Sequence, residues 1–296
     1  MINTNSLLFV ASLLLSLIFV GNLNAYGQTS KDNFIQGLLR TNRGEDQQAM
    51  PFFNKAIELK PDYFEAYMMR GSTYMRLGDH MNAIMDFDKA LELDETLVKA
   101  YNYRGFCYLE LNDLRRAVRD FSKVIELKPD YPNAFESRGY SKSLLNQHKE
   151  AIDDYDQAIT MQPDFHEAYH HRAWSKFAIK DTTGALSDLV KAIELNEDNA
   201  LYYHDYALIL MEARDFKEAI KNFGKAIKLD EKMATAYLNR AKAKIELGKV
   251  KPSCKDLETA SELGNADAKE LLDVHCIDES KDSEENSEEK TSSEKD

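Results

Sequence analysis

Apolar and small residues recur along most of this chain at intervals of 34 residues. An aromatic residue marks each step, at Tyr67, Tyr101, Phe135, Tyr169, Tyr203 and Tyr237. With Phe64 as position 1 of a repeat, the aromatic stands at position 4 and glycine or alanine at position 8. Positions 4, 8 and 11 share one face of a helix A, and positions 20, 24 and 27 share one face of a helix B. The pattern predicts about seven helix pairs between residues 30 and 264.

Small residues at positions 8 and 20 allow the two helices of a repeat to approach closely. Position 24 is aromatic or leucine and fills the remaining space. A large side chain at Gly105 or Ala117 is therefore expected to overpack the repeat.

The residues between the helices also follow the period. Helix A is expected to end at residues that tolerate a left-handed backbone: Gly44, Gly78, Asn112, Asn146 and Gly248. Polar residues stand where the next helix A needs a cap, at Asp62, Thr96, Asp130, Asp164 and Asp198. After residue 264, Ala268, Leu271 and Leu272 have helical spacing and predict a short helix that covers the last repeat.

This pattern resembles the tetratricopeptide repeat (TPR) family over roughly residues 30–264. The resemblance implies an all-α, right-handed α-solenoid of antiparallel helix pairs with a C-terminal capping helix. It also implies a non-catalytic scaffold or adaptor that binds a peptide or protein segment in its concave groove. We expect no enzyme activity and no cofactor. An assembly factor that uses the array ends or the convex face is the alternative.

The resemblance further implies that positions 5, 9 and 12 of helix A face the groove. The candidate partner-binding residues at these positions are Met68, Met75, Asn102, Phe106, Glu136, Tyr140, His170, Trp174, Phe177, His204 and Met211. Aromatic residues and methionine are favoured at binding surfaces. The alternative is that position 9 simply packs against the neighbouring helix A. The Lys, Asn and Arg clamp by which related co-chaperones hold a chaperone C-terminus is missing here.

Arginine recurs at position 7, and aspartate recurs at position 23 of the same repeats. The aspartates are Asp86, Asp120, Asp154 and Asp188. A solvated or inter-repeat ladder of salt bridges, for instance to these aspartates, explains the arginines better than an anion-binding site does.

Residues 166–170 read His-Glu-Ala-Tyr-His, which matches the zinc hydrolase motif H-E-x-x-H. Such an enzyme would use His166 and His170 as zinc ligands and Glu167 as general base. The repeat explains the motif better, because Ala168 and Tyr169 are repeat residues. Zinc hydrolysis is therefore an unlikely alternative, and no metal is expected.

Residues 1–27 stand outside the repeats. Leu7 to Val20 is an apolar run of the length of a signal-peptide core, followed by cleavage options after Gly27 and Ala25. Export to the periplasm or the exterior is expected, with an uncleaved membrane anchor as the alternative. The array then spans residues 28–277.

Residues 278–296 hold nine acidic residues and three lysines, and no large apolar residue. Such a segment is expected to be a disordered acidic tail. The whole chain has a formal net charge of -13. A nucleic-acid partner is not expected, because such proteins normally carry a basic face.

Three cysteines are present. The expected capping helix runs antiparallel to the preceding helix B, which brings Cys276 near Cys254. A disulfide between them is plausible in an exported protein, and two free thiols are the alternative. Cys107 is expected to be a small packing residue.

Overall fold

The computed structural model describes residues 29–276, which form fifteen α-helices and contain no strand. The predicted signal peptide and acidic tail lie outside these residues. The helices are α2 (Ser30–Thr41), α3 (Asp46–Leu59), α4 (Phe64–Arg76), α5 (His80–Leu93), α6 (Val98–Glu110), α7 (Leu114–Leu127), α8 (Pro132–Leu144), α9 (His148–Met161), α10 (His166–Ala178), α11 (Thr182–Leu195), α12 (Ala200–Glu212), α13 (Phe216–Leu229), α14 (Ala234–Glu246), α15 (Val250–Glu262) and α16 (Ala266–His275).

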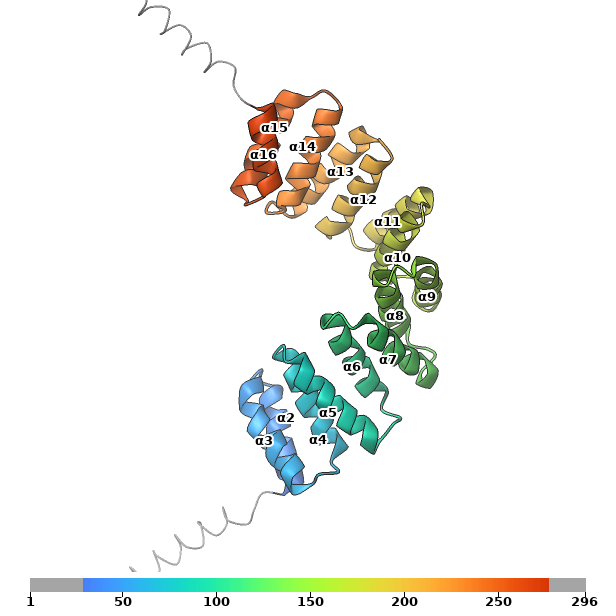
Figure 1. Cartoon of the computed structure of the whole chain (residues 1–296), viewed down its shortest axis with the longest axis vertical. Coiled ribbons are helices and arrows are strands. Elements are labelled where there is room, and N and C mark those ends of the chain that lie inside the picture. Colours follow the sequence, from blue (N-terminus) through green and yellow to red (C-terminus); the bar gives the residue numbers. More distant parts are fainter. Residues whose placement is uncertain (1–28, 277–296) are drawn as a thin grey trace, which may run out of the picture. The chain divides into compact units, whose positions relative to one another are not determined.

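The chain divides into two compact units at Pro129 and Asp130. The N-terminal unit contains α2–α7, and the C-terminal unit contains α8–α16. In each unit, even-numbered helices A pack against the following helices B, and each helix B packs against the next helix A (Figure 1). The predicted all-α fold of tandem helix pairs is confirmed. None of the helices in the described part of the chain is long and apolar enough to cross a membrane.

The predicted ends of helix A are confirmed. Gly44, Gly78, Asn112, Asn146 and Gly248 all have positive φ. In two repeats the same conformation is taken by Lys180 and Arg214, where no helix-ending residue was predicted.

The predicted caps of helix A are wrong by one residue. The cap positions of α4, α6, α8 and α10 are Tyr63, Leu97, Tyr131 and Phe165, and none of them makes a side-chain cap hydrogen bond. At α12 the cap is Asn199 rather than Asp198. These positions are used for packing instead: Phe165 is buried, and the ring of Tyr63 lies 5.0 Å from that of Phe34. Aspartate caps four of the helices B, namely α5, α7, α11 and α13.

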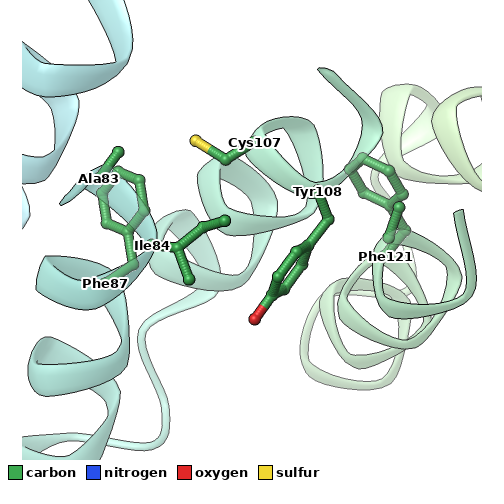
Figure 2. Packing of buried hydrophobic residues seen from close by; sticks show 7 residues of the cluster. Ala83, Ile84, Phe87, Cys107, Tyr108 and Phe121 are labelled. Carbon is green, nitrogen blue, oxygen red and sulfur yellow. The ribbon is translucent and has the colours of Figure 1, made fainter. Parts of the chain in front are cut away.

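The glycine at position 8 lies under the aromatic ring at position 24 of the same repeat. A Cβ atom added to Gly105 would lie 2.9 Å from Phe121 Cε1, and one added to Gly71 would lie 2.8 Å from Phe87 Cε1. Figure 2 shows Phe87 and Phe121 in one cluster, on either side of Cys107 and Tyr108 of α6. The repeat thus needs its smallest residue where its largest one packs.

Replacement of Gly105 by leucine should lower the free energy of unfolding by about 1–3 kcal/mol, because the new side chain overlaps the Phe121 ring. Gly224→Ala is the matched control, since the added Cβ would meet only Arg240 Nη1 at 3.6 Å. It should stabilise α13 by up to about 1 kcal/mol. Denaturant unfolding followed by circular dichroism measures both changes. An unchanged midpoint for Gly105→Leu would contradict the packing.

The predicted Arg–Asp pairs form, with one further pair, but they lie within each repeat rather than between repeats. Among the ion pairs of the position 7 arginines with described residues, only Arg104 with Asp88 and Arg172 with Asp156 also link two repeats. Arg70, Arg104, Arg138, Arg172 and Arg240 each donate Nε and Nη2 to the aspartate sixteen residues later: Asp86, Asp120, Asp154, Asp188 and Asp256. Each guanidinium also lies 5.3–5.6 Å from the ring at position 4. Most of these rings are half-buried, so they contact the guanidinium groups of the ladder rather than filling the core.

The predicted capping helix is α16. Its Ala268, Leu271 and Leu272 pack against α14 and α15 through Leu238 and Leu257. Cys254 and Cys276 form a disulfide with a Cα–Cα distance of 5.8 Å, which joins the start of α15 to the end of α16. Cys107 is a free, fully buried thiol, as predicted, and burial raises its pKa to about 12.

Candidate partner-binding surfaces

An apolar groove of about 590 Å³ opens in the N-terminal unit between helices A of the first three repeats. We call it the N-terminal groove. It is lined by Phe34, Leu38, Phe64, Glu65, Met68, Met69, Ser72, Arg76, Thr96, Leu97, Val98, Lys99 and Tyr103. Three charged side chains line the groove. Those of Glu65 and Lys99 are exposed, and that of Arg76 pairs with Asp46. The interior therefore suits an apolar ligand group, with charge of both signs around it.

Met68 is the one candidate residue that lines this groove. Sequence reasoning missed Phe34 and Leu38, although they stand at positions 5 and 9 of the first repeat. That repeat has Asn33 instead of an aromatic residue at position 4, which hides its register. Position 1 was a second signal for this groove. Among the repeats after the first, the residue at position 1 is large and apolar only at Phe64 and Val98.

The other candidates of the N-terminal unit differ in exposure. Met75 packs against the cluster of Figure 2. Phe106 is exposed, with its ring edge-on to Phe121 at 5.2 Å. Asn102 is buried, and its Oδ1 has no hydrogen-bond partner among the described residues. An unsatisfied buried acceptor is rare in proteins.

In the C-terminal unit, helices A hold a buried polar network centred on Asp205 of α12. Its Oδ2 accepts hydrogen bonds from His170 Nε2 at 2.7 Å and Trp174 Nε1 at 2.9 Å. Its Oδ1 accepts from His204 Nδ1 at 3.0 Å, and His204 Nε2 lies 3.3 Å from Asn239 Nδ2. We call these five residues the Asp205 network. It joins candidates from α10 and α12, His170, Trp174 and His204, at one carboxylate.

Burial acts to raise the pKa of Asp205. Hydrogen bonds from His170, His204 and Trp174 outweigh it and lower the pKa to about 2. The carboxylate is therefore ionised, and all its contacts are donors already committed to it. This arrangement fixes the indole of Trp174 in place.

Asp205 was missed because it stands at position 6 of its repeat, whereas the resemblance implies a groove formed by positions 5, 9 and 12. The other repeats have Met69, Tyr103, Ser137, His171 and Asn239 there. This repeat also lacks the ladder, because Tyr206 replaces the arginine and Asn222 the aspartate. The sequence did contain a signal for this site: the repeat lacks the Arg–Asp pair of most other repeats and has an aspartate at position 6.

The remaining candidates surround this network within the C-terminal unit. Glu136 accepts a hydrogen bond from His171 Nδ1 at 2.7 Å, and Tyr140 lies against the same imidazole at 4.9 Å. Phe177 meets Trp174 edge-on at 6.0 Å. Met211 packs beside the apolar cluster of α12 and α13. His170 and His204 are buried, so contact area is offered by the half-buried candidates Glu136, Tyr140, Trp174, Phe177 and Met211.

The H-E-x-x-H residues have other partners. His166 Nδ1 lies 2.8 Å from the hydroxyl of Tyr202, and His170 is bonded to Asp205. Among residues 29–276, no group of three His, Cys, Asp or Glu side chains is placed to hold a metal ion. The zinc alternative thus finds no ligand set in this part of the chain.

Comparison with known proteins gives the family. Tetratricopeptide repeat models match residues 33–63, 64–97, 98–131, 133–165 and 200–233, more than half of the chain. No curated protein matches it significantly.

Solved structures share the fold. A tetratricopeptide repeat protein from Parabacteroides merdae is 18% identical with a TM-score of 0.68, over 84% of this chain and 100% of that one. A MamA structure is 25% identical with a TM-score of 0.53, over 54% and 94%. YrrB, described as a TPR protein with an unusual peptide-binding site, is 22% identical with a TM-score of 0.52, over 62% and 95%. This chain belongs to the tetratricopeptide repeat family.

Proposed function

We propose that this protein is a non-catalytic scaffold that binds a peptide or protein segment on its helices A. The N-terminal groove carries the proposal, because it combines an apolar interior with a volume in the range of ligand sites. YrrB, a structural neighbour, is described as binding a peptide. The fold is typical of proteins that present a surface rather than perform chemistry.

The lining of the groove indicates the chemistry of the partner. Met68 and Met69 are flexible and polarisable, and they lie beside Phe34, Phe64 and Tyr103. The partner is therefore a segment that inserts a large apolar side chain.

Val98→Glu tests the groove. Val98 is the first residue of α6, where a carboxylate favours the helix, so the fold should be kept. The same charge placed in an apolar groove should weaken binding at least about tenfold. The probe is a peptide pool selected on the wild-type protein from a random display library.

Ala200→Glu is the matched control, because Ala200 is the first residue of α12 and lies outside the groove. It should bind the pool like wild type. Equal binding by Val98→Glu would reject the groove. If Trp174→Ala with Tyr140→Ala abolished binding instead, the partner would be assigned to the C-terminal unit.

We also propose that the protein is exported, with a Gram-negative periplasm as the compartment. The apolar run Leu7 to Val20 and the small residues before Gln28 support export. The disulfide between Cys254 and Cys276 supports an oxidising compartment. Mass spectrometry of the protein from its source cells would give Gln28 or Tyr26 as first residue. A retained Met1 in the membrane fraction would assign an anchor instead.

A further inference from the structure

Six lysines lie on two helices B of the C-terminal unit, and all six are exposed. They are Lys217, Lys221, Lys225 and Lys228 of α13, and Lys251 and Lys255 of α15. We call them the lysine face. Along α13 they follow a spacing of three and four residues, which places them on one side of the helix. Lys251 and Lys255 repeat the positions of Lys217 and Lys221 one repeat later, so both pairs point to the same side of the stack.

The lysine face is a region of excess positive charge in an acidic chain. Between Lys217 and Lys255 there are eleven lysines and arginines and four acidic residues, whereas the whole chain is strongly acidic. The equivalent two positions of α9 are Lys149 and Asp153, which cancel. The equivalent positions of α7 are Arg115 and Arg119, so one helix B of the N-terminal unit also carries a basic pair, but only α13 and α15 carry such pairs on consecutive helices B.

Little of this charge is neutralised by neighbours. Lys221 pairs with Glu218 at 3.0 Å, and Lys225 lies 5.0 Å from the ring of Tyr203. In the described part of the chain, the other four lysines of the face have no ion-pair partner. A concentrated positive field without counter-charges attracts an anionic segment.

The chain itself carries such a segment, directly after α16. Residues 278–296 have nine acidic residues and three lysines. The disulfide holds Cys276, two residues before this segment, on Cys254, which lies between Lys251 and Lys255 on α15. The described part of the chain therefore ends at the lysine face, and the acidic segment continues from there in the sequence. Nineteen residues can reach up to about 60 Å, so length does not limit the contact.

We propose that residues 278–296 dock on the lysine face of their own chain. Opposite charge, the position of the disulfide and the length of the segment all point to this occupant. Attachment raises the local concentration of the segment to about the millimolar range, so individually weak ion pairs are enough. The segment then keeps the face from other acidic molecules until salt or a stronger anionic partner displaces it.

Lysine reactivity tests the proposal in the full-length protein. An amine-reactive reagent is applied at low salt, and labelling is quantified by mass spectrometry. The test variant replaces Glu284, Glu285, Glu288 and Glu289 by glutamine, which lowers the charge of the segment without shortening it. Labelling at Lys217, Lys221, Lys251 and Lys255 should rise at least about threefold in the variant.

Lys149 is the internal control, because it is exposed at the same helix position of α9 within the same unit. Its labelling should not change. Wild-type protein in about 1 M salt should behave like the variant, since the screening length falls to about 3 Å. Equal labelling of wild type and variant at low salt would overturn the proposal. Protection that disappears on dilution would assign the face to a second copy's segment, and would overturn it equally.

Discussion

Replacement of Asp205 by alanine is expected to lower the free energy of unfolding by about 3 kcal/mol. The change leaves His170 Nε2, His204 Nδ1 and Trp174 Nε1 without their acceptor. A buried donor that loses its acceptor costs about 1–3 kcal/mol. Two of the three donors belong to buried histidines, so the expected loss of stability lies at the upper end of this range.

Asp205→Asn should cost less, about 1–2 kcal/mol. Its carbonyl oxygen can still accept from His170 and Trp174, while its amide donates to the Nδ1 of the other His204 tautomer. Asp153→Ala is the control, because it removes an exposed acidic residue from α9 and should change stability by less than about 0.5 kcal/mol.

Trp174 is the only tryptophan of the chain, so its fluorescence reports on the Asp205 network directly. Denaturant titrations should show the order wild type, Asp205→Asn, Asp205→Ala from most to least stable. If the alanine variant matched wild type, the hydrogen bonds around Asp205 would not contribute to stability.

The same carboxylate predicts a dependence on pH. The pKa of Asp205 is about 2 in the folded protein and 3.8 in its ordinary state. The stabilisation is therefore complete above about pH 4 and is lost as the pH falls through 2; it amounts to about 2 kcal/mol. The stability gap between wild type and Asp205→Ala should narrow across this acidic range.

The fold could be predicted from the sequence because the repeats share the same pattern of small and large packing residues. Gly105 and Phe121 must be small and large together, and the same pair returns as Gly71 with Phe87. Because the aligned repeats share this pattern, a departure in one repeat does not hide it. The left-handed helix ends followed for the same reason, since Gly78 or Asn112 marks a conformation that most residues avoid.

Other features could not be read from the repeat, because tertiary contacts decide them. Phe165 takes a cap position for packing, although the neighbouring Asp164 is the better capping residue. Asp205 and the N-terminal groove depend on which side chains of different repeats meet. A consensus register hides those contacts, because they arise where one repeat differs from the rest.

Loss of the disulfide between Cys254 and Cys276 is the second large expected effect. The bond closes a loop with a sequence separation of 22 residues. Chain-entropy arguments for a loop of this length give about 3 kcal/mol of stabilisation. We expect the replacement of both cysteines by serine, or reduction by a dithiol, to destabilise α16 by about this amount.

The loss should remain local, because each repeat of such an array contacts only its neighbours. Amide hydrogen exchange should therefore rise first in α16 and then in α15, which lose the contacts of Leu271 and Leu272 with Leu257. Exchange in α4 and α5 of the N-terminal unit serves as the internal control. Unfolded, unreduced protein should present one reactive thiol, that of Cys107. Three reactive thiols would show that the bond is absent. One thiol with unchanged exchange in α16 after reduction would show instead that apolar packing alone holds this helix on the array.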